Sequence, residues 1–593
     1  MKNRIKNLNL IEKNWFCYIL ILFFSGLICI PLLNSTVDVF QDDGIQHICR
    51  LIGTEQSLGE QSVFPVIMSN FCNEFGYSWN LFYSILTAYV PLLFRIFCPS
   101  YVGCLKLFIY LITALSGFSM FAFTKRVTKN QTIAILASIF YILLPYRITD
   151  MYMRIAIAEL ASFVFLPMVF HGIYAILEDC KTKDSSKPMN LVLVVGAVGL
   201  ILTHTVITLY TAIFALVYII VQYRKLNKKA ILQFLISIIL ILLLTAFFLI
   251  PLLEHRMATE YEVFQKGRMA ITEVLEYYKL DVGQLFYTQN DSRSFEIGTM
   301  ILIGSILAIL AIIKKKVKSN ETKQTIFFLV LGILCTILTL KIFPFEKLPE
   351  LLCMIQFTYR FLEFAGFFLS FVAAVGFVRF FTRFDWGDLA VIALLTFLLL
   401  LPLHRFISYD TGGWTEDKLY PAVPVTEGTG RVHAGCASFE YLPTKAFQNM
   451  DYIVQREKGT IIQKGEAEIL GEEKEKNISN IWLTANSSEL SLELPYIYYL
   501  GYTIRIKSVE AETWQKEIIG YESEKGFLAV DLSHLEEGTQ YEIVVYYTGT
   551  FLMKVSLAIS ILTGIGIFLG YGIYFAKKRK KALEKIDEKP KIE

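Results

Sequence analysis

The chain has 593 residues, 54% of them hydrophobic, with a mean hydropathy of +0.50 and a formal net charge of +3. Repeated apolar runs are long enough to cross a hydrocarbon core of about 30 Å, so the composition predicts a polytopic membrane protein. The small net charge and the scattered basic residues exclude a nucleic-acid partner. The ten cysteines form no CxxC or metal-ligand spacing, and we expect no disulfide framework.

The charge pattern sets the expected topology. Lysine and arginine cluster near residues 2–13, 125–129, 181–187, 224–229, 314–316, 379–383 and 577–581. By the positive-inside rule these clusters are cytoplasmic, and so are both chain ends. The loop of residues 34–80 carries six acidic residues against Arg50 alone, so we expect it on the extracytoplasmic side.

Twelve membrane spans satisfy this pattern. The first is expected to be uncleaved, because its long apolar run lacks a small-residue cleavage site. Residues 81–98 are expected to form a juxtamembrane or re-entrant helix, since a crossing there would invert every later basic loop. The predicted spans cover approximately residues 15–33, 104–124, 131–147, 158–177, 189–203, 206–223, 230–252, 298–313, 324–341, 361–379, 388–404 and 551–576.

Two kinds of domain follow from this division of the chain. Residues 405–550 are largely polar, and their second half alternates β-branched and aromatic residues with turn residues, which predicts a small extracytoplasmic β-sandwich. The fold class is therefore an all-α polytopic membrane protein with a smaller β-rich domain. Residues 1–404 form the transmembrane domain, with external loops at 34–103, 148–157, 253–297 and 342–360, and residues 551–593 form a final span and a basic tail.

Charged and polar side chains from separate spans are expected on the outer side. Such groups at span ends are costly unless they are paired or solvated, so their convergence predicts a polar cavity at the membrane interface. The set comprises Asp42, Asp43, His47, Arg50, Arg147, Asp150, Arg154, Glu159, His204, Glu254, His255, Arg256 and Arg360.

The segment QDDGIQHICR, residues 41–50, carries the most specific pattern. If it is helical, Asp43, His47 and Arg50 lie on one face. A carboxylate there is suited to act as a general base toward a hydroxyl, or to bind a divalent cation. Capping of a helix N-terminus by Asp42 or Asp43 is the alternative interpretation.

The second outer segment, around Asp150, repeats this spacing. Asp150 and Arg154 are four residues apart, which fits either an intrahelical ion pair or part of a site. Arg147, Arg154 and Arg360 are suited to hold a phosphate through their planar guanidinium groups, although an arginine at a span end also reaches lipid headgroups. His204 and His255 fit structural roles as well as functional ones.

Several segments together resemble a known family. DGIQHICRL, ILLPYRITDMYMRIAIAEL, LTHT, IQFTYRFLEF and EYLPTKA are similar to bacterial membrane proteins labelled 6-pyruvoyl-tetrahydropterin-synthase-related. That group resembles the GT-C superfamily of polyprenyl-phosphate-sugar glycosyltransferases. The resemblance implies a GT-C-like fold in the bacterial cell membrane, and inverting transfer of a sugar from a polyprenyl-phosphate donor to an envelope glycan, lipid or protein on the outer face.

The resemblance also implies roles for particular residues. Asp43 matches the acidic residue of the first external loop, Asp150 a second acidic residue, and Asp42 stands where the family commonly has histidine, so these three are the candidate catalytic residues. A divalent cation held by Asp43 and Asp150 would fit this chemistry. Seven scattered histidines argue against a pterin or zinc site. The expected substrate-binding residues are His47, Arg50, Arg147, Arg154, Glu159, His204, His255 and Arg360.

Two other functions stay open at this point. One is a transporter or flippase of lipid-linked sugars, which the number of predicted spans favours. The other is a non-catalytic envelope assembly protein whose β-domain binds a partner.

Overall fold

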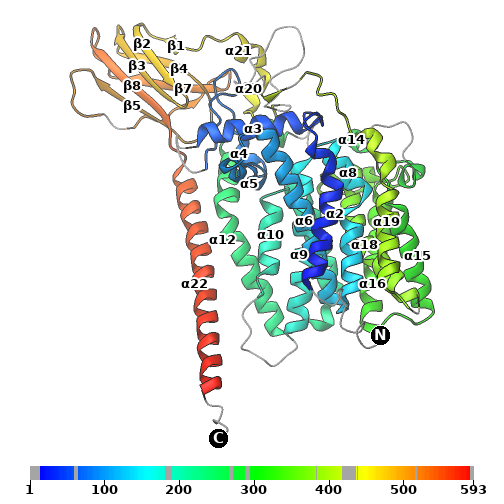
Figure 1. Cartoon of the computed structure of the whole chain (residues 1–593). Coiled ribbons are helices and arrows are strands. Elements are labelled where there is room, and N and C mark those ends of the chain that lie inside the picture. The colour runs from blue at the N-terminus through cyan, green and yellow to red at the C-terminus, as the bar shows by residue number, and fades with distance from the viewer. Residues whose placement is uncertain are drawn as a thin grey trace.

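The structure is a computed structural model of the chain, and it describes residues 14–58, 64–180, 190–265, 272–287, 294–381, 383–413, 415–416, 436, 439–514 and 517–587. A bundle of helices carries a β-domain at one end, and a long final helix runs beside the bundle (Figure 1). The first described helix begins, and the last one ends, at the bundle end opposite the β-domain (Figure 1). The side of the membrane that this end faces stays a prediction.

Eight helices of the described chain are long and apolar enough to cross a membrane. They are α2 (Asn14–Cys29, continued by η2, Ile30–Leu33), α6 (Tyr101–Thr128), α9 (Ile157–Asp179), α12 (Lys228–Ala258), α16 (Ser319–Leu338), α18 (Phe361–Phe380), α19 (Trp386–Leu398, continued by η9, Leu401–Phe406) and α22 (Phe551–Asp587). A ninth span results if α7 (Gln131–Ile142) and α8 (Pro145–Tyr152), which are bent by 42° at their junction, count as one.

The prediction of twelve spans is not confirmed. The remaining predicted spans correspond to the shorter apolar helices α10 (Val192–Ile201), α11 (Thr205–Val221) and α15 (Thr299–Ile313), of 10, 17 and 15 residues. At a rise of 1.5 Å per residue, even α11 reaches only about 26 Å, short of a hydrocarbon core of about 30 Å. Hydropathy alone does not separate such half-length helices from full spans.

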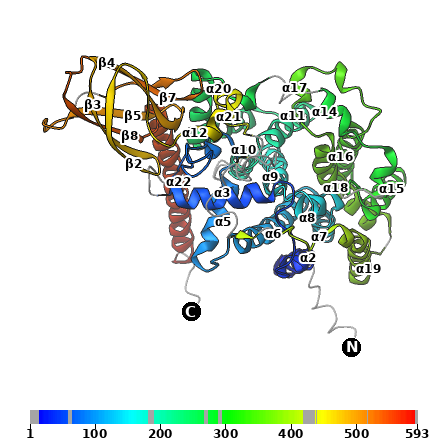
Figure 2. The same cartoon turned by 90° about the horizontal axis from the view of Figure 1, so that it is seen from above.

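Helix α3 (Gly44–Ser57) lies across the end of the bundle that carries the β-domain (Figures 1 and 2). The apolar stretch that follows is divided among α4 (Trp79–Phe82), α5 (Leu86–Leu93) and η3 (Phe94–Ile96), so it forms no continuous span. Its backbone is tied to the α10–α11 junction, where Leu86 N–H donates to the Leu202 carbonyl at 3.1 Å. The other short helices are η4 (Tyr223–Lys225), η5 (Glu262–Phe264), α14 (Thr272–Tyr277), η6 (Val282–Leu285), η7 (Phe345–Lys347), α17 (Glu350–Cys353), η8 (Thr358–Arg360), α20 (Thr444–Gln448) and α21 (Met450–Gln455).

The β-domain consists of two four-stranded antiparallel sheets, with strand orders β1-β4-β7-β6 and β2-β3-β8-β5. Alternating side chains such as Leu483, Leu492, Val530 and Ile543 point inward and share one apolar core. The strands are β1 (Ile461–Lys464), β2 (Ala467–Glu475), β3 (Ile478–Ala485), β4 (Glu489–Ile497), β5 (Tyr502–Ser508), β6 (Tyr521–Glu522), β7 (Phe527–Ser533) and β8 (Gln540–Tyr547). The first part of the predicted external domain contributes helices, not strands, among its described residues.

The loop between α3 and α4 joins the β-domain to the bundle. Ile497 N–H donates to the Phe75 carbonyl at 2.9 Å, and Lys474 Nζ donates to the Glu74 carbonyl at 2.6 Å. The Phe75 ring packs against Phe527 of β7 at a centroid distance of 5.1 Å. The β-domain therefore contacts the loop that directly follows α3.

Candidate functional site

Asp43 directly precedes α3, and the residue that follows it, Gly44, has to be glycine for steric reasons. A Cβ on Gly44 would lie 1.9 Å from the Val39 carbonyl oxygen, so only glycine allows this close turn into the helix. Asp43 occupies the N-cap position, but its carboxylate makes no capping hydrogen bond. Its backbone N–H donates to the Arg154 carbonyl at 3.1 Å. Asp43 therefore occupies the cap position that the sequence allowed, but its side chain does not cap the helix.

A buried cluster of two arginines and two carboxylates lies next to this turn. Glu159 Oε2 accepts from Arg154 Nη1 at 3.0 Å and from Arg360 Nε at 3.2 Å. Arg154 Nη1 also pairs with Asp150, and the Tyr146 hydroxyl donates to Glu159 Oε1. The four charged side chains are 0 to 7% exposed. We call Asp150, Arg154, Glu159 and Arg360 the ionic cluster.

Three separate elements build the ionic cluster. Asp150 belongs to α8, Glu159 to the first turn of α9, and Arg360 ends η8. Arg154 lies in the short link between α8 and α9, and its guanidinium packs over the Tyr359 ring at 5.0 Å. Balanced charges and shared hydrogen bonds stabilise groups that would be costly to bury alone.

The carboxylate of Asp43 belongs electrostatically to this cluster. Burial raises its pKa above the usual value, and the nearby Arg154 and Arg360 guanidinium groups lower it by less; Asp42 and Glu159 raise it further. A carboxylate with a raised pKa holds a proton more firmly than an ordinary aspartate. Asp42, by contrast, is exposed and takes a left-handed backbone conformation, with φ of 40°.

His47 and Arg50 follow Asp43 on one face of α3, as predicted. The His47 side chain is 3% exposed, and neither ring nitrogen has a hydrogen-bond partner among the described residues. Burial, with the charge of Arg50 as a smaller cause, lowers the pKa of His47 to about 3, so the ring is neutral at physiological pH. A neutral, unpartnered histidine next to a carboxylate can still accept or donate one hydrogen bond to a ligand.

Arg50 makes contacts with the segment that follows α3 in the chain. Its guanidinium donates to Asn80 Oδ1 at 3.2 and 2.9 Å, to Thr87 Oγ1 at 3.2 Å and to the Ser84 carbonyl at 2.6 Å. It also stacks over the Tyr83 ring at 5.0 Å. These bonds engage all three nitrogens of the guanidinium, so Arg50 holds the α4–α5 segment against α3. Phosphate binding by Arg50 stays a prediction.

Two further predicted residues make their hydrogen bonds outside the ionic cluster. His255, within α12, has its ring nitrogens 2.9 Å from the Pro251 carbonyl and 3.1 Å from the Leu500 carbonyl, so it joins the span to the β-domain backbone. Arg147 donates to Ser116 Oγ at 3.3 Å and Thr113 Oγ1 at 3.1 Å, both on α6. These contacts give both residues structural roles, and Arg147 Nε has no hydrogen-bond partner in the described chain. Substrate binding by either residue stays a prediction.

His204 has the structural role that the sequence allowed, and its substrate-binding role stays a prediction. Its Nδ1 accepts from Ile207 N–H at 3.3 Å and so caps α11. Its nearest charges are Arg360, Glu159 and Arg154, which places the ring beside the ionic cluster. The capping bond uses one of the two ring nitrogens.

Comparison with known proteins gives the family. A family model described as "6-pyruvoyl-tetrahydropterin synthase related domain; membrane protein" matches residues 81–408, which is more than half of the chain. The chain belongs to this family. The 6-pyruvoyl-tetrahydropterin-synthase-related match covers the ionic cluster and His204 but begins after Asp43, His47 and Arg50.

A relative of this family member is known from Lactococcus lactis subsp. cremoris (strain MG1363). It carries the description "Uncharacterized protein" and is 24% identical over 349 residues, which cover 57% of this chain and 56% of the relative. The chain thus spans about half the length of the relative it matches. The family model supports a membrane protein, and the description of the relative names no reaction.

The predicted metal site would use acidic residues of this chain. Within the described ranges, no group of three or more His, Cys, Asp or Glu side chains is arranged to hold a metal ion. A divalent cation between Asp43 and Asp150 stays a prediction, with a substrate phosphate as the required additional ligand.

Two residues next to the ionic cluster, Glu363 and Tyr146, were not predicted from the sequence. Glu363, in the first turn of α18, accepts from Ser162 Oγ at 2.7 Å, and its Oε2 has no partner in the described chain. Tyr146 bonds both Glu159 and Arg154. A carboxylate inside the apolar run FLEF was the available signal for Glu363, because acidic residues in spans are rare without a function.

Proposed function

We propose that this chain transfers a sugar from a polyprenyl-phosphate donor to an acceptor hydroxyl on the extracytoplasmic side of the membrane. The observation that carries the proposal is the Asp43 carboxylate, which is not used in capping and lies beside two buried arginines at one end of a helical bundle. Supporting it further, Asp43 directly precedes α3, and α3 lies at the bundle end that carries the β-domain (Figures 1 and 2).

Asp43 acts in this proposal as the general base. The acceptor oxygen attacks the anomeric carbon, the bond from that carbon to the phosphate oxygen breaks, and the hydroxyl proton passes to Asp43. A base whose pKa lies above that of an ordinary aspartate takes this proton more readily. The electron pair of the broken bond leaves with the phosphate, and attack from the opposite face inverts the sugar carbon.

Arg154 and Arg360 stabilise the leaving phosphate. Within the described chain, Arg154 donates hydrogen bonds only through Nη1, and Arg360 only through Nε and Nη1. Each guanidinium therefore retains N–H groups for the growing negative charge. Glu159 holds both groups in place before the substrate arrives, which is the arrangement that makes electrostatic stabilisation effective.

Transport of a lipid-linked sugar is the second candidate function. Buried charges such as Glu363 and Arg147 within apolar helices are typical of transporters. However, Arg147 is the third residue of α8, Glu159 the third of α9 and Glu363 the third of α18. Glu159 and Glu363 therefore lie near the start of a span, whereas transporters bind their substrates near the membrane midplane. Arg147, which donates to Thr113 and Ser116 halfway along α6, lies deeper and is the charge that transport would use.

The proposal is tested with purified chain in lipid nanodiscs and a panel of synthetic polyprenyl-phosphate monosaccharides. We expect one of these donors to release polyprenyl phosphate, in a ratio of one to one with a glycosylated acceptor. A chain that moves a donor across vesicles without cleaving it would support the transporter. Absence of both activities, together with unchanged envelope glycans in a deletion strain, would leave the proposal without support.

A further inference from the structure

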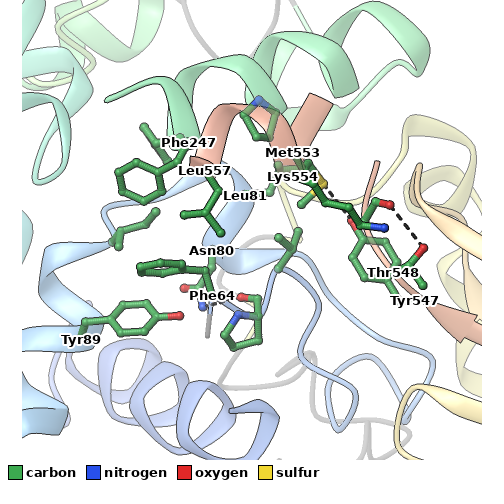
Figure 3. Close-up of a pocket in the computed structure, with 16 residues that line it drawn as sticks. Phe64, Asn80, Leu81, Tyr89, Phe247, Tyr547, Thr548, Met553, Lys554 and Leu557 are labelled. Carbon is green, nitrogen blue, oxygen red and sulfur yellow. Dashed lines mark hydrogen bonds between the residues drawn. The ribbon is translucent and has the colours of Figure 1, made fainter. Parts of the chain in front are cut away.

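A pocket of about 100 Å³ lies where α12 and α22 meet the β-domain (Figure 3). Apolar side chains from three directions line it: Phe247 and Phe248 from α12, Leu557 from α22, and Leu81 and Tyr89 from α4 and α5. The wall is mainly apolar. The pocket is lined by none of the residues of the ionic cluster, nor by Asp43.

Two helices that are apolar enough to cross a membrane flank the pocket. Both α12 and α22 are long enough to cross the membrane, and their apolar side chains are largely exposed on the structure, for example Leu242 at 55% and Leu562 at 68%. Figure 1 shows α22 beside α12 and apart from the other helices. Since the pocket lies near the β-domain ends of these two spans, it faces the zone where acyl chains meet headgroups.

One basic residue stands at this pocket. Lys554 is the fourth residue of α22, is exposed, and has no ion-pair partner among the described residues. The other basic residues of this helix, Lys577–Lys581 and Lys585, lie at its far end, where the positive-inside rule places them. A lysine at the β-domain end of the span is therefore an exception to the pattern, and an ammonium group at headgroup depth attracts phosphate.

The other polar groups at the pocket are already engaged. Asn80 accepts from Arg50 and donates to the Pro65 carbonyl at 3.0 Å. Glu254, the nearest acidic residue on α12, accepts from Thr550 Oγ1 at 2.5 Å. The polar contribution to a ligand thus falls to Lys554, while the apolar walls match a hydrocarbon chain.

We propose that this pocket binds one acyl chain of an anionic glycerophospholipid, with the lipid phosphate at Lys554. The bound lipid fills the space between α12, α22 and the α4–α5 segment, and so stabilises the final helix and the β-domain against the bundle. This site does not depend on the proposed glycosyl transfer, because none of its residues belongs to the catalytic set. Through Asn80, which also holds Arg50, the lipid stabilises the position of α3.

The test measures binding of phosphatidylglycerol to delipidated full-length chain in detergent by native mass spectrometry. Phosphatidylcholine is the headgroup control, and a polyprenyl phosphate is the competing lipid class. Lys554→Gln removes the charge, Leu557→Trp fills the pocket, and Lys577→Gln removes a charge from the opposite end of the same helix as the matched control.

We expect Lys554→Gln to weaken phosphatidylglycerol binding about fivefold, the effect of one lysine near a membrane surface. Leu557→Trp should abolish binding, and Lys577→Gln should leave it unchanged. If Leu557→Trp is not monodisperse, Phe247→Trp fills the same pocket from α12. Equal binding of the two phospholipids, equal losses in Lys554→Gln and Lys577→Gln, or preferential occupancy by polyprenyl phosphate would each overturn the inference.

Discussion

Glu159 and Arg360 form an ion pair of 3.2 Å between α9 and the start of α18, although 201 residues separate them in the sequence. The same Glu159 oxygen accepts from Arg154, so one carboxylate holds two guanidinium groups in a buried site. A single side chain therefore determines both the stability of this end of the bundle and the position of the proposed phosphate-binding groups.

Removal of the Glu159 charge should destabilise the protein. In Glu159→Gln two buried guanidinium groups lose their shared counter-charge, and breaking a buried pair in this way costs about 3–5 kcal/mol. We expect a clear decrease in the midpoint of thermal unfolding in detergent. The double variant Glu159→Gln/Arg360→Met should recover part of this loss, because it removes one of the unpaired charges.

An exposed pair in the same protein is the control for this experiment. Lys458 and Glu74 form an ion pair of 2.6 Å, with both side chains 57% exposed. Solvent screens such a pair, so Glu74→Gln should cost less than about 1 kcal/mol. Equal shifts in the unfolding midpoint for Glu159→Gln and Glu74→Gln would contradict a structural role of the ionic cluster.

The rate of the proposed reaction should fall on the acidic side. Asp43 must be deprotonated to act as base, and its pKa is raised by burial against the lowering effect of Arg154 and Arg360, with Asp42 and Glu159 adding to the raise. Activity therefore rises as pH increases through a value above 3.8, the ordinary value for aspartate. The measurement is kcat/KM for donor cleavage against pH.

Substitution of His47, on the same face of α3, shows which group causes the fall in rate at low pH, called here the acidic limb. The pKa of His47 is lowered to about 3, so this ring does not change its charge above about pH 4. His47→Gln should lower the rate without moving the limb. A limb that disappears in His47→Gln would assign the titration to the histidine and contradict the role of Asp43.

Oxidation should cross-link the loop between α3 and α4 to the segment before α20. Cys72 and Cys436 are buried, with their Sγ atoms 3.6 Å apart. When the two sulfurs approach to about 2.05 Å they form a disulfide, in which two electrons reduce two copper(II) phenanthroline complexes to copper(I) and two protons pass to solvent. Mass spectrometry of unreduced peptides should find this link. Cys335, buried in α16, should stay unlinked, and links formed at random among the ten cysteines would contradict the arrangement.

The local features of this fold could be predicted from the sequence, whereas the partners across the bundle could not. The break between α10 and α11 at His204 and the common face of Asp43, His47 and Arg50 follow from spacing, and both predictions are confirmed. The pairing of Glu159 with Arg360 depends on how distant helices pack, which no local pattern records. Likewise Arg147 and His255 have the right residue types, but packing directs them to α6 and to the β-domain.

The number of spans shows a second limit of sequence patterns. Apolar runs identify α10, α11 and α15 as apolar helices, but their length in the structure is decided by where a turn interrupts the hydrogen-bond ladder. The α10 run ends at Ile201 and α11 begins again at Thr205, after a capping histidine. Hydropathy is the same on both sides of such a break, so it overestimates the number of complete crossings.

The most direct test of the central claim compares two neighbouring substitutions, Asp43→Asn and Asp42→Asn. Both remove one negative charge, and asparagine tolerates the left-handed backbone conformation found at residue 42. The measurement is release of polyprenyl phosphate by the purified chain, as kcat/KM. We predict a loss of about 100-fold or more for Asp43→Asn, the usual effect of removing a general base, and a change of at most a few-fold for Asp42→Asn. Equal activities of the two variants, or a greater loss for Asp42→Asn, would contradict the assignment of Asp43 as the base.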